Sequence, residues 1–163
     1  MKIVFGLGNP GKEYARSRHN TGFILLDNYA SSKGLKWLKE DKFKAETAKD
    51  GDLLLVKPQT FMNNSGDCAS LVVNFYKADP QDVLVIHDDV DLELGRTKKQ
   101  LGGGSAGHHG VEDIYKKLGT DGIWRFRVGV GRPDNSRFDV LDWVLGSFSD
   151  EDLSTIIKLN FLG

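Results

Sequence analysis

The apolar residues of this chain fall into short runs of two different periods, which predict alternating strands and helices. The run from Val83 to Ile86 is wholly apolar and mostly β-branched, as in a central strand of a sheet. The pair Asp50-Gly51 lies between two further runs and predicts a hairpin. In segment 124–130 apolar residues alternate with basic residues or glycine, so we expect a strand with one solvated face. The predicted strands are residues 2–7, 44–48, 53–56, 83–86, 96–101 and 124–130.

Helical spacing of apolar residues separates most of these strands. Val111, Ile114 and Leu118 recur at that spacing, and Gly119 marks the end of their helix. Ser149, three residues before Asp152, is typical of a helix N-cap. The predicted helices are residues 23–34, 66–76, 111–118, 138–145 and 150–161. We therefore predict an α/β fold: a single domain over residues 1–163, with a twisted mixed sheet and helices on both faces.

Size and composition agree with one globular domain. A chain of 163 residues can bury a core without disulfides or metals. The single cysteine, Cys68, excludes an internal disulfide and fits a reducing compartment. No signal peptide, transit peptide or membrane-spanning run is visible, so we expect a cytoplasmic protein without membrane contact.

Charge is distributed unevenly along the chain although its net value is only −1. Residues 96–137 carry nine basic and four acidic residues, a net charge of +5, which leaves −6 for the rest. Such a block either attracts a polyanion or is an ordinary solvated face. Its basic members are Arg96, Lys98, Lys99, Lys116, Lys117, Arg125, Arg127, Arg132 and Arg137.

Glycines and polar residues follow the first strand, where α/β sheets often place a site. Gly6, Gly8 and Gly11 have the spacing of a dinucleotide-binding loop. The next apolar helix begins only near Phe23, which disfavours that interpretation. His19 lies in the same stretch and is either a general base, if another group orients its ring, or a surface histidine.

Three other polar segments lie at predicted strand ends or before helices. Residues 59–66 contain Asn and Ser that either bind substrate or cap the next helix. Residues 87–91, His-Asp-Asp-Val-Asp, suit an active site, a turn or a magnesium cluster. The loop 102–107 is either a mobile linker or a set of backbone N–H groups facing an anion or carbonyl. No Cys/His pair has the spacing of zinc ligands, so we do not expect a zinc site.

These segments, taken together, resemble the bacterial-type peptidyl-tRNA hydrolases. The similarity extends from residue 2 to about residue 153, and the first two motifs are highly specific. The motifs are Gly-Leu-Gly-Asn-Pro-Gly-x-x-Tyr-x-x-x-Arg-His-Asn-x-Gly at 6–22, Lys-Pro-x-Thr-Phe-Met-Asn-x-Ser-Gly at 57–66, His-Asp-Asp-x-Asp at 87–91 and Gly-Gly-Gly-Ser-Ala-Gly-His-x-Gly at 102–110.

The resemblance implies cleavage of the ester between a peptide and the 3′ end of tRNA, without metal or cofactor. It implies that His19 is the general base for the attacking water and that Asp88 orients its imidazole. Asn9 would help to distinguish blocked from free aminoacyl-tRNA, and Asn63 would hold the substrate near the scissile carbonyl.

The resemblance also implies where peptidyl-tRNA binds. Tyr14, Phe61 and Met62 would line the groove for the 3′ CCA end and the peptide. Arg127 would contact tRNA phosphates of the acceptor stem. The protein is expected to act as a monomer without an obligate protein partner.

The chain departs from the family pattern at three places. His109 replaces the usual substrate-contacting Asn, and Gln100 replaces a common basic partner of the phosphate clamp, for which Lys98 or Lys99 would have to compensate. The end at Gly163 predicts a shortened C-terminal helix. Two other functions stay open on these residues: a non-catalytic RNA-binding relative and a nucleotide-dependent enzyme.

Overall fold

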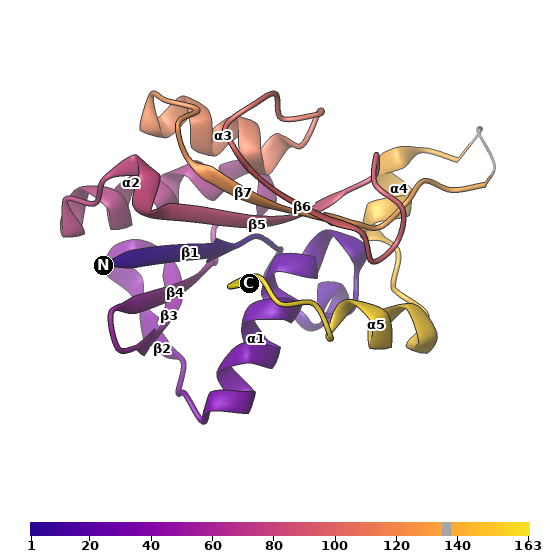
Figure 1. Cartoon of the computed structure of the whole chain (residues 1–163), viewed down its shortest axis with the longest axis horizontal. Helices are drawn as coiled ribbons and strands as arrows, with labels where there is room; N and C mark the ends of the chain where they lie inside the picture. Colours follow the sequence, from indigo (N-terminus) through magenta and orange to yellow (C-terminus); the bar gives the residue numbers. More distant parts are fainter. Residues whose placement is uncertain (135–137) are drawn as a thin grey trace.

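Seven strands form one sheet in the order β2-β3-β4-β1-β5-β7-β6 (Figure 1). The computed structural model describes residues 1–134 and 138–163. Strands β4, β1, β5 and β7 are parallel, whereas β2, β3 and β6 join antiparallel, so the sheet is mixed as predicted. The strands are β1 (Lys2–Gly6), β2 (Leu38–Glu40), β3 (Ala45–Asp50), β4 (Leu53–Pro58), β5 (Val83–Asp89), β6 (Thr97–Leu101) and β7 (Trp124–Gly129).

Helices cover both faces of the sheet, as the sequence predicts (Figure 1). Helices α2 and α3 pack on one face, and α1 and α5 pack on the other. The helices are α1 (Thr21–Lys33), α2 (Ser65–Tyr76), α3 (His109–Leu118), α4 (Val140–Leu145) and α5 (Asp150–Ile156). Three short 3-10 turns matter for the site: η1 (Lys12–Tyr14), η2 (Arg18–Asn20) and η4 (Met62–Asn64).

The alternation of side chains along β1 divides the core into two layers. Ile3 and Phe5 belong to the apolar cluster under α2 and α3, while Val4 packs with Leu25 and Leu26 of α1. All of these side chains are at most 2% exposed. Burial on both faces explains why the central strands read as continuous apolar runs. Within the described residues, no helix has the length and apolar content needed to cross a membrane.

Two sequence-based expectations are wrong. The last helix ends at Ile156 and not near residue 161. Strand β7 has no solvated face at Arg125, because the Gly102–Gly104 segment lies over that side chain and leaves it only 1% exposed. The basic block is therefore not one solvated surface, and its Arg137 lies outside the described residues.

Gly22 lets α1 touch the backbone of two strands. A Cβ atom at this position would lie 2.7 Å from the Ile86 carbonyl oxygen and closer still to the Leu7 amide nitrogen. Gly22 lies only three residues after His19, so this packing also fixes the position of the segment that carries His19.

We expect Gly22→Ala to lower the free energy of unfolding by about 3 kcal/mol, because neither backbone segment can retreat without disturbing the sheet. Urea unfolding followed by circular dichroism measures the change. Gly104→Ala is the matched control, since its Cβ would have no atom within 4 Å, and its effect should stay within about 0.5 kcal/mol. Equal effects of the two substitutions would contradict the packing argument.

Candidate active site

Segments from four parts of the chain meet at the carboxyl ends of the parallel strands. They line a cavity of about 290 Å³. His19 belongs to η2, Asn63 to η4 and Asp88 to β5, and His108 is the residue directly before α3. This edge of the sheet is where parallel strands end together, which brings distant loops into contact.

Asp88 lies between two imidazole rings. Its carboxylate is 2.9 Å from His19 Nδ1 and 2.9 Å from His108 Nε2. The Asp88 side chain is 2% exposed, and those of His19 and His108 are 12% and 8% exposed. The predicted contact between residues 19 and 88 is therefore present, and a second histidine shares the carboxylate.

The hydrogen bonds define the proton positions on both rings. The Val111 N–H donates to His108 Nδ1 at 3.3 Å, so the proton of a neutral His108 sits on Nε2 and is donated to Asp88. The carboxylate accepts from His19 Nδ1, which leaves His19 Nε2 with its lone pair. Within the described residues, that nitrogen has no protein hydrogen-bond partner.

The same contacts shift the pKa values of Asp88 and His19. Burial would raise the pKa of Asp88, but the charges and hydrogen bonds of His19 and His108 lower it far below its ordinary value. Burial would lower the pKa of His19, but the charge and hydrogen bond of Asp88 together raise it above 6.5. The site thus holds an ionised carboxylate against a more basic imidazole.

The three groups also have the composition of a metal site, which no sequence spacing indicated. Ligand atoms of His19, Asp88 and His108 all lie within 4.8 Å of one another. However, metal binding through His108 Nε2 would require a proton on Nδ1, where the Val111 N–H already donates. The donor set therefore favours a hydrogen-bonded triad.

The acidic side chains of Asp88, Asp89 and Asp91, at the end of β5 and just after it, diverge, which disfavours the magnesium interpretation. Asp89 accepts from Arg127 Nε at 2.7 Å, and Asp91 pairs with Arg132 at 2.6 Å. Asp88 faces the two histidines. Because each carboxylate has a different partner, their oxygens do not converge as a Mg²⁺ site requires.

Asn9 ties the first loop to two others. Its backbone N–H donates to Asn20 Oδ1 at 2.8 Å, and Asn20 Nδ2 donates back to the Asn9 carbonyl at 2.9 Å. Its side-chain oxygen accepts the Met62 N–H at 2.7 Å. Asn9 is only 8% exposed, so any contact with substrate falls to its Nδ2. The next helix starts only at Thr21, unlike the turn of a dinucleotide-binding loop.

Only some of the residues expected to bind substrate line this cavity. Asn63 and His109 line the cavity, together with three apolar side chains of α4. Within the described residues, Tyr14, Phe61 and Met62 are absent from its wall. Met62 is 3% exposed and packs in the core, so its side chain is a structural one, whereas Phe61 is 52% exposed beside it. The α4 side chains are Val140, Leu141 and Val144.

The expected phosphate-binding residues do not share one surface. Lys98 pairs with Arg127 across β6 and β7, and Lys99 pairs with Phe126. Opposed residues point to the same face of a sheet, so Lys98 lies beside Arg127. Lys99 lies on the other face, over the ring of Trp124 at 5.9 Å. Only Lys98 can therefore act together with Arg127.

Arg127 is held by internal partners. Its side chain is 15% exposed, its Nε donates to Asp89, and its Nη1 donates to Gln100 Oε1 at 2.9 Å. Gln100 in turn donates to the Gly102 carbonyl at 2.8 Å. The residue that replaces the usual basic side chain thus joins Arg127 to the glycine loop.

Sequence reasoning missed two buried residues of this site. The sequence motif assigns His108 no role, and its position directly before a helix is a weak signal because histidine is not among the residues that usually cap a helix. Arg125 belongs to the basic block, which the sequence allows to be either a polyanion-binding surface or a solvated face. Its burial has no local signal, because it depends on the loop that covers it.

Comparison with known proteins shows the family of the chain. The family model described as peptidyl-tRNA hydrolase matches residues 3–160. The peptidyl-tRNA hydrolases of Lactobacillus helveticus and Neisseria meningitidis are 44% and 46% identical, over 93% of this chain and 82% and 80% of theirs. The crystal structure of the Acinetobacter baumannii enzyme superposes with a TM-score of 0.88 at 32% identity, covering 96% of this chain and 81% of that one. The chain therefore belongs to the peptidyl-tRNA hydrolase family.

Proposed function

We propose that the cavity hydrolyses the ester between a peptide and the 3′ end of tRNA, with His19 as general base. The observation that carries this proposal is the 2.9 Å contact of His19 Nδ1 with Asp88. It directs the proton to Nδ1 and leaves Nε2 of a cavity-lining ring to accept a proton from water. Asp88 then stabilises the imidazolium that forms, while its own low pKa prevents it from taking the proton.

Neighbouring groups provide substrate contacts in this proposal. Asn63 offers an amide donor and acceptor that match a peptide backbone regardless of its side chains. His109 is 69% exposed at the rim, 3.4 Å from Glu112, and offers one donor in place of an Asn amide. The apolar wall of α4 suits the uncharged part of a peptide.

In our proposal the macromolecule that this protein binds is tRNA. Lys98 and Arg127 contact phosphates of the acceptor stem, and the CCA end enters the cavity. The protein acts as a cytoplasmic monomer without metal or cofactor. The intact His19–Asp88 pair favours catalysis over a non-catalytic RNA-binding role.

We expect His19→Ala to lower kcat on N-acetyl-aminoacyl-tRNA by about 10²- to 10⁴-fold, because water loses its base. Binding of uncharged tRNA should change less than about twofold, since no phosphate contact is removed. Single-turnover hydrolysis and filter binding measure the two quantities. His19→Asn is the polar control and should be as impaired. A kcat near that of the wild type would refute the role of His19.

The raised pKa of His19 determines the pH dependence. Protonated His19 cannot accept a proton, so kcat/KM should fall with decreasing pH, with a midpoint above 6.5. Asp88→Asn removes the charge that raises this pKa, so the midpoint should move to lower pH while kcat falls at least about tenfold. The chain has four histidines, so NMR titration of imidazole nitrogens can resolve His19 directly. A wild-type midpoint below 6.5 would contradict the assignment.

Arg127→Ala tests the phosphate contact. If Arg127 releases Asp89 to bind a phosphate, the substitution should weaken tRNA binding and reduce the slope of log K against log salt by about one. Lys99→Ala is the matched control, because Lys99 lies on the opposite face of the sheet. An unchanged slope would mean that Arg127 acts only through its internal ion pair.

A further inference from the structure

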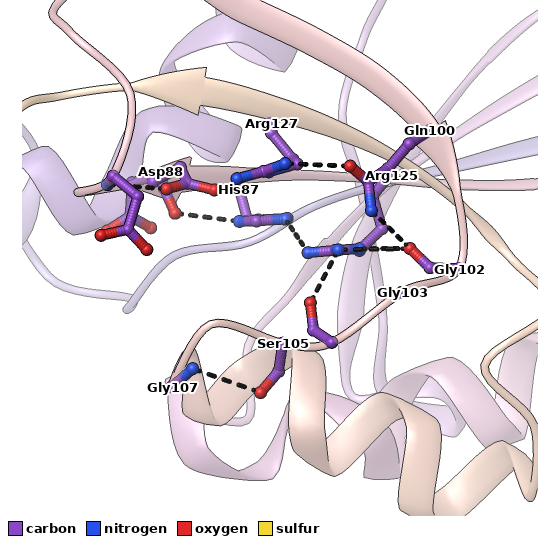
Figure 2. Close-up of polar contacts among 12 residues, drawn as sticks. His87, Asp88, Gln100, Gly102, Gly103, Ser105, Gly107, Arg125 and Arg127 are labelled. Carbon is purple, nitrogen blue, oxygen red and sulfur yellow. Dashed lines mark hydrogen bonds and ion pairs between the residues drawn. The ribbon is translucent and has the colours of Figure 1, made fainter.

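Arg125 is a buried cation with an unusual set of partners (Figure 2). It is 1% exposed, yet within the described residues its guanidinium contacts no carboxylate. Nη2 donates to the carbonyls of Gly104 at 2.8 Å and Gly102 at 3.2 Å, and Nε donates to Gly102 at 3.3 Å. Nη1 donates to His87 Nε2 at 3.2 Å. A buried charge held only by neutral groups is costly, and packing alone does not require it.

The first branch of this network reaches Asp88 through His87. Because Arg125 donates to Nε2, the proton of neutral His87 sits on Nδ1 and is donated to the Asp88 backbone carbonyl at 2.9 Å. Burial, with the nearby charges of His108 and Arg125, lowers the pKa of His87 to about 3, so the ring stays neutral. The ring also packs edge-on against His108, with centroids 4.9 Å apart.

The second branch reaches His108 through the glycine loop. Three successive carbonyls, of residues 102–104, accept side-chain donors, and Arg125 supplies those to Gly102 and Gly104. Tyr115 Oη donates to the carbonyl between them at 2.9 Å. The loop then leads into His108, whose Nε2–H donates to Asp88. The position of His108 therefore depends on where this loop is held.

We propose that Arg125 is a positioning residue for the hydrolytic reaction, which holds Asp88 and His108 in place from two sides. The inference rests on the proposed function, since it assumes that Asp88 orients His19. The planar guanidinium suits this task because its donors point in several fixed directions at once. A lysine ammonium at the same place would keep the charge but could not reach His87 and both carbonyls together.

Arg125→Lys tests the proposal without removing charge. We expect kcat on N-acetyl-aminoacyl-tRNA to fall at least tenfold, while KM and the salt dependence of tRNA binding change less than twofold. The His19 midpoint, from the pH profile and from imidazole NMR without substrate, should move down toward 6.5 as its contact with Asp88 loosens. Arg125→Met, similar in size and uncharged, should fold and lose kcat at least as strongly.

Arg16→Lys is the control, because Arg16 is half-exposed and pairs on the surface with Asp150, and it should leave all these quantities unchanged. Wild-type kcat and His19 midpoint in either Arg125 variant, even with a lower Tm, would overturn the proposal and leave Arg125 a structural role. No turnover of N-acetyl-aminoacyl-tRNA by the wild type would instead refute the proposed function. The NMR midpoint separates the two failures, because it requires no catalysis.

Discussion

The site depends on one buried carboxylate that accepts hydrogen bonds from two imidazoles. Asp88 is removed from water, and a carboxylate in that position is stable only if donors replace its hydration. His19 and His108 provide those donors at 2.9 Å each. Because the two rings come from residues 69 and 20 positions away in the sequence, the loops that carry them must converge for the charge to be tolerated.

Backbone contacts hold those loops in place. Gly22 lets α1 approach β1 and β5 closely, and Asn9 and Asn20 bind each other through backbone and side-chain groups. On the other side, α3 begins at His109 with His108 as its cap, so the helix itself fixes the proton on the second imidazole. The hydrogen bonds of Asp88 with His19 and His108 are thus supported by groups that have little freedom to move. Catalysis by a preorganised site needs such support.

The distribution of charge near the site differs from that of a simple basic surface. Arg125 is buried, Arg127 is paired with Asp89, and Lys98 and Lys99 point to opposite faces. The net charge counted along a sequence segment is therefore larger than the positive charge that the folded protein exposes to a polyanion. Gln100 illustrates the same point, since it has no charge and bridges Arg127 to the Gly102 carbonyl.

The sequence by itself determined most of the secondary structure, the α/β class and the loops that carry the chemistry, because side-chain period and turn residues act over a few neighbouring positions. It also indicated His19 and Asp88, because their motifs resemble those of the peptidyl-tRNA hydrolases. It did not predict β2 or the end of the last helix. Only the tertiary structure decided that His108 shares the carboxylate, that Met62 is a core residue and that Arg125 is buried. These outcomes depend on which segments cover a side chain after folding, and burial of that kind leaves no periodic trace in the sequence.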